Sequence, residues 1–110
     1  MSSAKTSVLS AALDRLWIQF LPQMTERVST LEAACTALSA SALSVEQRTE
    51  ANAAAHKLAG VLGTFGLTKG TELAREAEVI YSGEPDADPD AVTRLTAIAA
   101  QLRAIVASKK

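Results

Sequence analysis

Residues 55–67 read A-H-K-L-A-G-V-L-G-T-F-G-L and contain the single histidine of the chain, His56, inside a helical pattern. At about 100° per residue, the apolar side chains that follow gather on one side of a helix, with Phe65 at roughly 180° and Leu58 at roughly 200° from His56. His56 is therefore expected at the centre of the polar face of an amphipathic helix. The rest of the chain is expected to pack around the opposite face.

The positions that surround His56 on such a helix are unusually small. We call them the small-residue face: Asn52, Ala53, Ala59, Gly60 and Gly63. A glycine inside a helix costs about 0.5–1 kcal/mol relative to alanine, so these glycines indicate that something approaches the helix closely. Packing against a neighbouring helix is the structural alternative, but the position of the glycines beside His56 favours an approaching partner.

The run from His56 to Leu67 resembles the signature of histidine-containing phosphotransfer (HPt) domains. In that signature the histidine is followed by a residue that is often basic, a leucine, often a lysine, and a glycine, with another glycine further on. The matching residues are His56, Lys57, Leu58, Gly60 and Gly66. Ala59 departs from the pattern, because many family members have a lysine there that approaches the phosphoryl group, and this leaves Lys57 as the only basic residue in the first turn of the motif.

The resemblance implies a phosphorelay intermediate that accepts a phosphoryl group on His56 and exchanges it with aspartates of response-regulator receiver domains, or with a histidine kinase. It implies a carrier without kinase activity of its own. No cofactor is expected, and magnesium is expected on the partner, since no carboxylate cluster is visible beside the histidine. The expected contacts for the phosphoryl group or the partner are Asn52, Ala53, Lys57, Ala59, Gly60 and Gly63.

Two of these contacts have simpler interpretations. Asn52, one turn before His56, is placed to hydrogen-bond the ring or the partner, or else is only solvated. Lys57, at roughly 100° from His56, is placed to pair with phosphate oxygens, although a charge beside a helix face most often serves solubility.

Length and composition indicate one small helical domain that spans residues 1–110. A chain of 110 residues can build one modest core but not a nucleotide-binding kinase module as well. The sequence is 48% hydrophobic and 4% aromatic, which favours packed helices over sheets.

A net charge of −1 with scattered Lys and Arg argues against nucleic-acid binding. One cysteine, no signal peptide and no apolar run long enough for a bilayer indicate a cytoplasmic protein that does not associate with membranes.

Apolar spacing predicts five helices. The first is short and carries the stripe Leu9, Leu13, Leu16, Trp17 and Phe20. Pro22 then restarts a second helix that continues to about residue 40, because proline is favoured in the first turn of a helix and disruptive later.

The remaining helices have clear start and stop signals. Ser44 and Gln47 form a capping box that opens the helix of His56 at residue 45, and Gly66 ends it in a left-handed conformation. The fourth helix starts near residue 68 and ends at Gly83. Asp88 as N-cap and Pro89 at the first helical position open the last helix.

Short links between four long helices imply antiparallel neighbours, hence an all-α, up-and-down four-helix bundle whose additional short N-terminal helix covers one end. The HPt resemblance implies the same architecture. Each apolar stripe can be buried within one bundle, so we expect a monomer without a large exposed apolar patch.

The sequence lacks the residues that a zinc site or a di-iron site would need. One histidine and one cysteine on different helices cannot form a tetrahedral zinc site, and no E-x-x-H pair is present for a di-iron centre, so no metal site is expected. Cys35 lies on an apolar stripe and is interpreted as a buried small side chain. The main alternative function is a non-catalytic helical adaptor that binds a partner protein through an apolar groove, with His56 incidental.

Overall fold

The computed structural model describes residues 2–108, and for residues 2–8 the backbone alone. In that range the chain forms α1 (Ser2–Ser39), α2 (Val45–Thr64), α3 (Thr68–Ser82), the 3₁₀ helix η1 (Pro85–Ala87) and α4 (Ala91–Ser108). None of these helices combines the length and the apolarity that crossing a bilayer requires.

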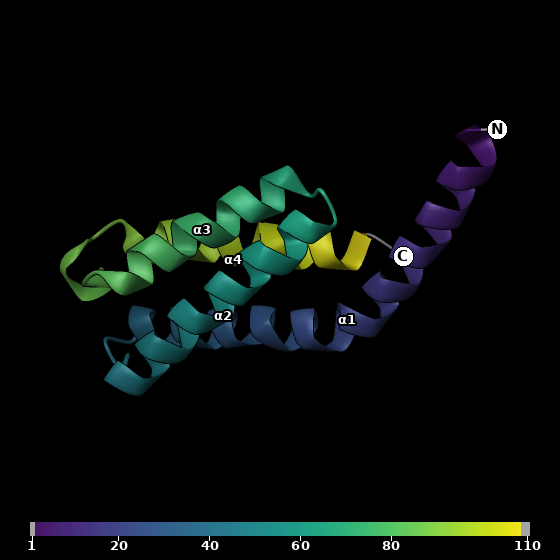
Figure 1. Ribbon diagram of the computed structural model, residues 1–110. Helices are drawn as coiled ribbons and strands as arrows, with labels where there is room; N and C mark the ends of the chain where they lie inside the picture. The colour runs from purple at the N-terminus through teal and green to yellow at the C-terminus, as the bar shows by residue number, and fades with distance from the viewer. Residues whose placement is uncertain (1, 109–110) are drawn as a thin grey trace.

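The four α-helices form a closed ring of neighbours. Helix α1 packs on α2 and α4, and α3 packs on the same two helices from the other side. Because the links are short, consecutive helices run antiparallel, as Figure 1 shows. The predicted up-and-down four-helix bundle is confirmed.

The helix boundary predicted at Pro22 is wrong. Residues 2–39 form one continuous helix with Pro22 inside it, so the separate short N-terminal helix is in fact the first half of α1. A proline inside a helix removes one backbone hydrogen bond and crowds the carbonyl four residues earlier, which can kink a helix without ending it. The purple N-terminal part of α1 bends away from the bundle and projects beyond its end (Figure 1).

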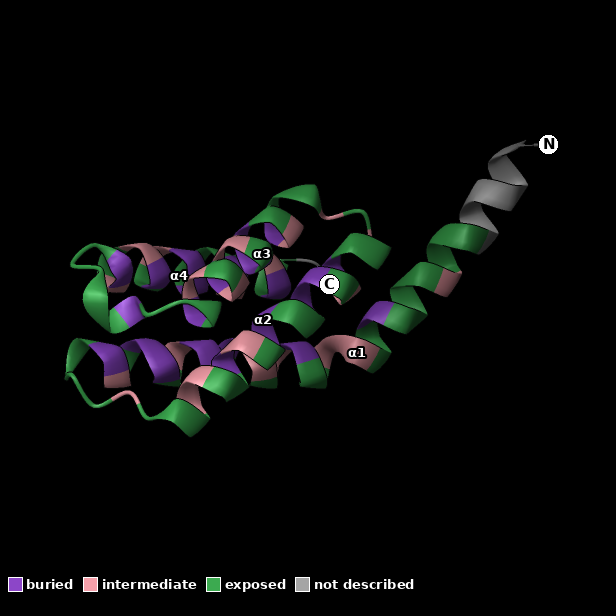
Figure 2. Ribbon diagram, turned by 60° about the vertical axis from the view of Figure 1, so that its left-hand side comes forward, coloured by how far each residue is buried: buried purple, intermediate pink, exposed green. Residues whose placement is uncertain are grey.

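The projecting part of α1 leaves apolar side chains in solvent, contrary to the expectation that every stripe is buried. Leu9 is 64% exposed, and the other exposed members of this group are Leu13, Leu16 and Ile18. From residue 9 onward, where burial is described, Figure 2 shows mostly exposed residues in this part. Trp17 differs, because it is buried at the end of the bundle with its ring edge-to-face on Phe65, the residue that follows α2, at 5.1 Å between centroids. Only the second half of α1 is a full member of the bundle.

Small residues let α2 and α3 pack closely. The buried alanines of these two helices are Ala51, Ala54, Ala55 and Ala59 on α2 and Ala74 and Ala77 on α3. A Cβ atom on Gly70 of α3 would lie 3.0 Å from Cδ1 of Leu62, closer than ordinary van der Waals contact. The close contact brings the side chains of α3 alongside the histidine helix.

Both ends of α2 carry the signals predicted for them. Ser44 Oγ accepts a hydrogen bond from the Gln47 backbone N–H at 3.0 Å, and Gln47 Oε1 accepts one from the Ser44 N–H at 3.0 Å. Gly66 has φ +70°, and its N–H donates to the Gly63 carbonyl while the Leu67 N–H donates to the Leu62 carbonyl. This is the Schellman pattern of helix ends. The caps fix the limits of α2 around His56.

Replacing Gly66 with alanine is expected to destabilise the fold by about 1 kcal/mol, because an L side chain is strained in the left-handed conformation. For a domain of this size the melting temperature should fall by about 4 °C. Thermal unfolding followed by circular dichroism measures the change. An unchanged melting temperature would show that the left-handed end of α2 contributes no stability.

The last helix begins later than predicted. Helix α4 starts at Ala91 rather than at Pro89, and η1 occupies part of the preceding link. Asp88 still acts as a local cap, since its Oδ1 accepts a hydrogen bond from the Asp90 N–H at 2.9 Å.

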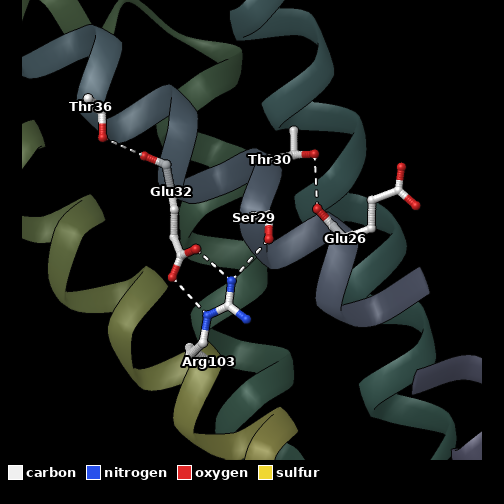
Figure 3. Close-up of polar contacts among 6 residues, drawn as sticks. All are labelled: Glu26, Ser29, Thr30, Glu32, Thr36 and Arg103. Atoms are coloured by element: carbon white, nitrogen blue, oxygen red, sulfur yellow. Dashed lines mark hydrogen bonds and ion pairs between the residues drawn. The ribbon is translucent and has the colours of Figure 1, made fainter. Parts of the chain in front are cut away.

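Side-chain ion pairs join neighbouring helices at the surface. Figure 3 shows Arg103 of α4 donating to both carboxylate oxygens of Glu32 on α1, at 2.6 and 2.9 Å, and to Ser29 Oγ at 3.1 Å. The hydrogen bond from Arg103 lowers the pKa of the Glu32 carboxyl. A second pair joins Arg94 of α4 to Glu76 of α3. Such exposed pairs add little free energy, but they align α4 with its neighbours.

Cys35 is buried, as its place on the apolar stripe predicted. Its sulfur lies 3.6 Å from the hydroxyl oxygen of Tyr81, and burial raises the pKa of the thiol. A thiol that resists ionisation is a poor nucleophile, so Cys35 serves the packing of the core.

Candidate functional site

His56 lies on α2 with its side chain 72% exposed. The residues next to it on α2 differ in burial. Ala55 and Leu58 are buried in the core, whereas Lys57 is exposed. The polar-face position predicted for the histidine is therefore where the structure places it.

One ring nitrogen of His56 is held by a carboxylate from the next helix. Nδ1 lies 2.8 Å from Oε2 of Glu78 on α3. An ionised carboxylate can only accept, so the proton of the neutral ring resides on Nδ1 and the lone pair resides on Nε2. No side chain of residues 9–108 and no backbone group of residues 2–108 hydrogen-bonds Nε2, which leaves that lone pair open to an incoming group.

Asn52 supports this arrangement from one turn earlier on α2. Its Nδ2 donates to the backbone carbonyl of Glu78 at 2.8 Å. Its amide group thus bonds α3 rather than the imidazole ring that sequence reasoning considered. The bond anchors the backbone of the residue that orients His56.

The small-residue face is asymmetric, and the expectation for Ala59 needs correction. Asn52 and Ala59 lie on the flank of His56 that faces α3, where Ala59 is only 5% exposed. Ala53 and Gly60 lie on the other flank and are exposed. Ala59 is buried because α3 covers one side of the polar face, which the helical period of α2 alone does not show.

Both glycines of the face remain accessible. A Cβ atom on Gly60 would meet nothing within 4 Å, and one on Gly63 would make an ordinary contact at 3.7 Å with Oγ1 of Thr71. Helix packing therefore does not require glycine at position 60. This open space is consistent with the interpretation that the glycines admit an approaching partner rather than a neighbouring helix.

A hollow of about 380 Å³ opens beside the imidazole, between α2 and α3. It is lined by His56, Ala59, Gly60, Arg75, Glu78 and Val79. One buried water needs roughly 15 Å³ by the same kind of measure, so the hollow has room for a phosphoryl group. Val79, on its rim, is 69% exposed and offers an apolar contact to a docking protein.

Sequence reasoning missed Glu78 and Arg75, the two charged residues of this hollow. Both are on α3, and their approach to His56 depends on the register between two antiparallel helices. The buried stripe of α3 indicated which residues face the core, but no motif signalled which neighbouring side chains reach His56.

The structure is a helical bundle with an exposed histidine that is hydrogen-bonded at one ring nitrogen. The family model described as Hpt domain matches residues 15–105. Protein RcaC of Microchaete diplosiphon is 37% identical over 79 residues, which cover 72% of this chain but 12% of that relative. No solved structure shows a significant match.

The chain belongs to the Hpt domain family. Hpt domains are carriers in histidine phosphotransfer within phosphorelays and are not kinases. Their partners are components of two-component systems.

Proposed function

We propose that His56 accepts a phosphoryl group from an aspartyl phosphate of a response-regulator receiver domain and returns it to the aspartate of another receiver. The observation that carries the proposal is the state of the imidazole ring. It is exposed, Nδ1 is bonded to Glu78 at 2.8 Å, and Nε2 is unoccupied among the described residues.

The transfer is a single in-line displacement. The Nε2 lone pair attacks phosphorus, the N–P bond forms, and the P–O bond to the receiver aspartate breaks, with its electron pair leaving on the carboxylate. The ring becomes positively charged while the proton on Nδ1 stays in the hydrogen bond to Glu78. The Glu78 carboxylate stabilises that positive charge as it develops. The reverse displacement returns the phosphoryl group to a receiver.

This domain contributes position and access, and the receiver supplies the remaining chemistry. Magnesium is held by the receiver in this proposal, and the domain is a substrate and carrier without turnover of its own. The exposed flank of the small-residue face, with Ala53 and Gly60, and the accessible Gly63 let the receiver bring its aspartyl phosphate to bonding distance of Nε2.

Replacing Glu78 with glutamine is expected to slow phosphorylation of His56 about tenfold, because an amide cannot balance the charge on the ring. Single-turnover transfer from a phosphorylated receiver measures the effect. Glu72→Gln removes one exposed carboxylate from the same helix and is the matched control. Equal losses in both variants would show that only the net charge of α3 matters.

The function itself is tested by incubating the protein with phosphorylated receivers from its own genome. Transfer of radiolabelled phosphate to the protein supports the proposal. The adaptor alternative predicts the opposite: no receiver labels the protein, while a partner protein still binds after His56 is replaced. The exposed apolar side chains of α1, Leu9 and Ile18 among them, are the feature that keeps this alternative open.

A further inference from the structure

A phosphoryl group on His56 creates a charge problem. It carries about two negative charges near neutral pH. Glu78 already places a carboxylate 2.8 Å from the same ring. That carboxylate offsets the positive charge on the ring but not the charge of the phosphoryl group on Nε2, so a cation beside the phosphoryl group would stabilise the phosphorylated site. Two basic residues are candidates: Lys57, which follows His56 on α2, and Arg75 of α3, which lines the hollow beside the ring.

The register of the two helices places Arg75 at the hollow beside His56, one turn from Glu78 on α3. His56 bonds Glu78, and Gly63, two turns later on α2, lies opposite Thr71, two turns earlier on α3. The same antiparallel register puts Ala59 opposite Arg75. Both residues line the hollow beside His56, and the small side chain of Ala59 leaves the hollow open.

The Arg75 side chain has no hydrogen-bond or ion-pair partner within the described part of the chain. Arg94 and Arg103 are bound by Glu76 and Glu32, and Arg48 donates to a backbone carbonyl. Arg75 is exposed and makes no hydrogen bond or ion pair with residues 9–108. Its guanidinium group is therefore available to a ligand in the hollow.

Lys57 is less well placed. It lies on the flank of His56 that is turned away from α3, and it does not line the hollow. Its ammonium group is a point charge, whereas a guanidinium group can hold two phosphate oxygens at once.

We propose that Arg75 binds the phosphoryl group on His56 through charge-assisted hydrogen bonds across the hollow, and so compensates its charge. The inference rests on the proposed function and adds to it a residue that contacts the transferred group. Arg75 acts from α3, beside the Glu78 carboxylate that holds the other nitrogen of the same ring.

The test uses phosphoramidate as a small phosphoryl donor, so that receiver docking plays no part. Arg75→Ala should lower the initial rate of His56 phosphorylation about fivefold, the range expected for an exposed ionic contact. Arg75→Lys should keep most of the rate. Ala59→Lys combined with Arg75→Ala should recover part of it, because an ammonium group then enters from the opposite wall. Arg15→Ala, which removes an exposed arginine from α1, is the matched control.

A ³¹P NMR titration of the phosphorylated proteins separates charge compensation from a structural effect. Without the cation, the pKa of the phosphoryl group should rise by about 0.5, an about threefold change in proton affinity. Circular dichroism verifies that the variants remain folded.

Equal rates and equal titration curves in the wild type and Arg75→Ala overturn the role of Arg75 while leaving His56 as the acceptor. Failure of the wild type to be phosphorylated by either phosphoramidate or a receiver overturns the proposed function itself. The two failures are therefore distinguishable.

Discussion

His56→Gln is expected to abolish phosphorylation of the protein and to leave its helical content unchanged. Glutamine has no nucleophilic ring nitrogen, so no N–P bond can form at this position. The fold should tolerate the change because the His56 side chain is exposed and, among the residues that the structure describes, hydrogen-bonds only Glu78 of α3. Labelling with a radioactive receiver phosphate and far-UV circular dichroism measure the two properties on the same sample.

The chemical stability of the label gives an independent check. A phosphoryl group on imidazole should be lost in acid and comparatively stable in base. Label that persists in His56→Gln, or that is stable in acid, would move the acceptor to another residue.

Gly60→Gln is expected to reduce phosphotransfer from a receiver about a hundredfold. Reacting groups tolerate little displacement, and an offset of about 1 Å can cost this much in rate. Position 60 is on the exposed flank one turn from His56, and the space that its Cβ would enter is empty in the free protein. A long side chain there should therefore hinder the receiver without disturbing the bundle. Wild-type transfer rates in Gly60→Gln would show that this surface does not contact the receiver.

Gly60→Ala is the matched variant that separates stability from docking. It should raise the free energy of unfolding by up to about 1 kcal/mol, because alanine has a higher helix propensity and its Cβ meets no obstacle. The melting temperature should rise by about 4 °C while transfer falls less than in Gly60→Gln. A lower melting temperature would indicate that glycine at this position serves packing after all.

The fold could be predicted largely from local signals. The capping box at Ser44 and the left-handed Gly66 depend only on residues close to them in the sequence. Both are found at the predicted positions. The helix boundary predicted at Pro22 was wrong because the effect of a proline depends on the packing around it. A proline is compatible with a helix start or with a kink, and the choice is made by the packing of the flanking turns, which sequence spacing does not specify.

The site could be predicted only as far as α2 determines it. The exposure of His56 follows from the helical period, and the structure agrees. The burial of Ala59 and the contact with Glu78 depend on where α3 lies and in which register, and both are properties of tertiary packing. The apolar pattern of a helix predicts which of its faces is polar, but not which neighbouring helix covers part of that face.

The central claim is that Nε2 of His56 receives the phosphoryl group while Nδ1 remains bonded to Glu78. Heteronuclear NMR of the phosphorylated, ¹⁵N-labelled protein at neutral or basic pH tests it most directly, because the ³¹P nucleus couples to the ring nitrogen to which it is bonded. We predict a single phosphohistidine with coupling to Nε2 of His56 and a proton retained on Nδ1. Coupling to Nδ1, or phosphorus bound to an oxygen of another residue, would contradict the account.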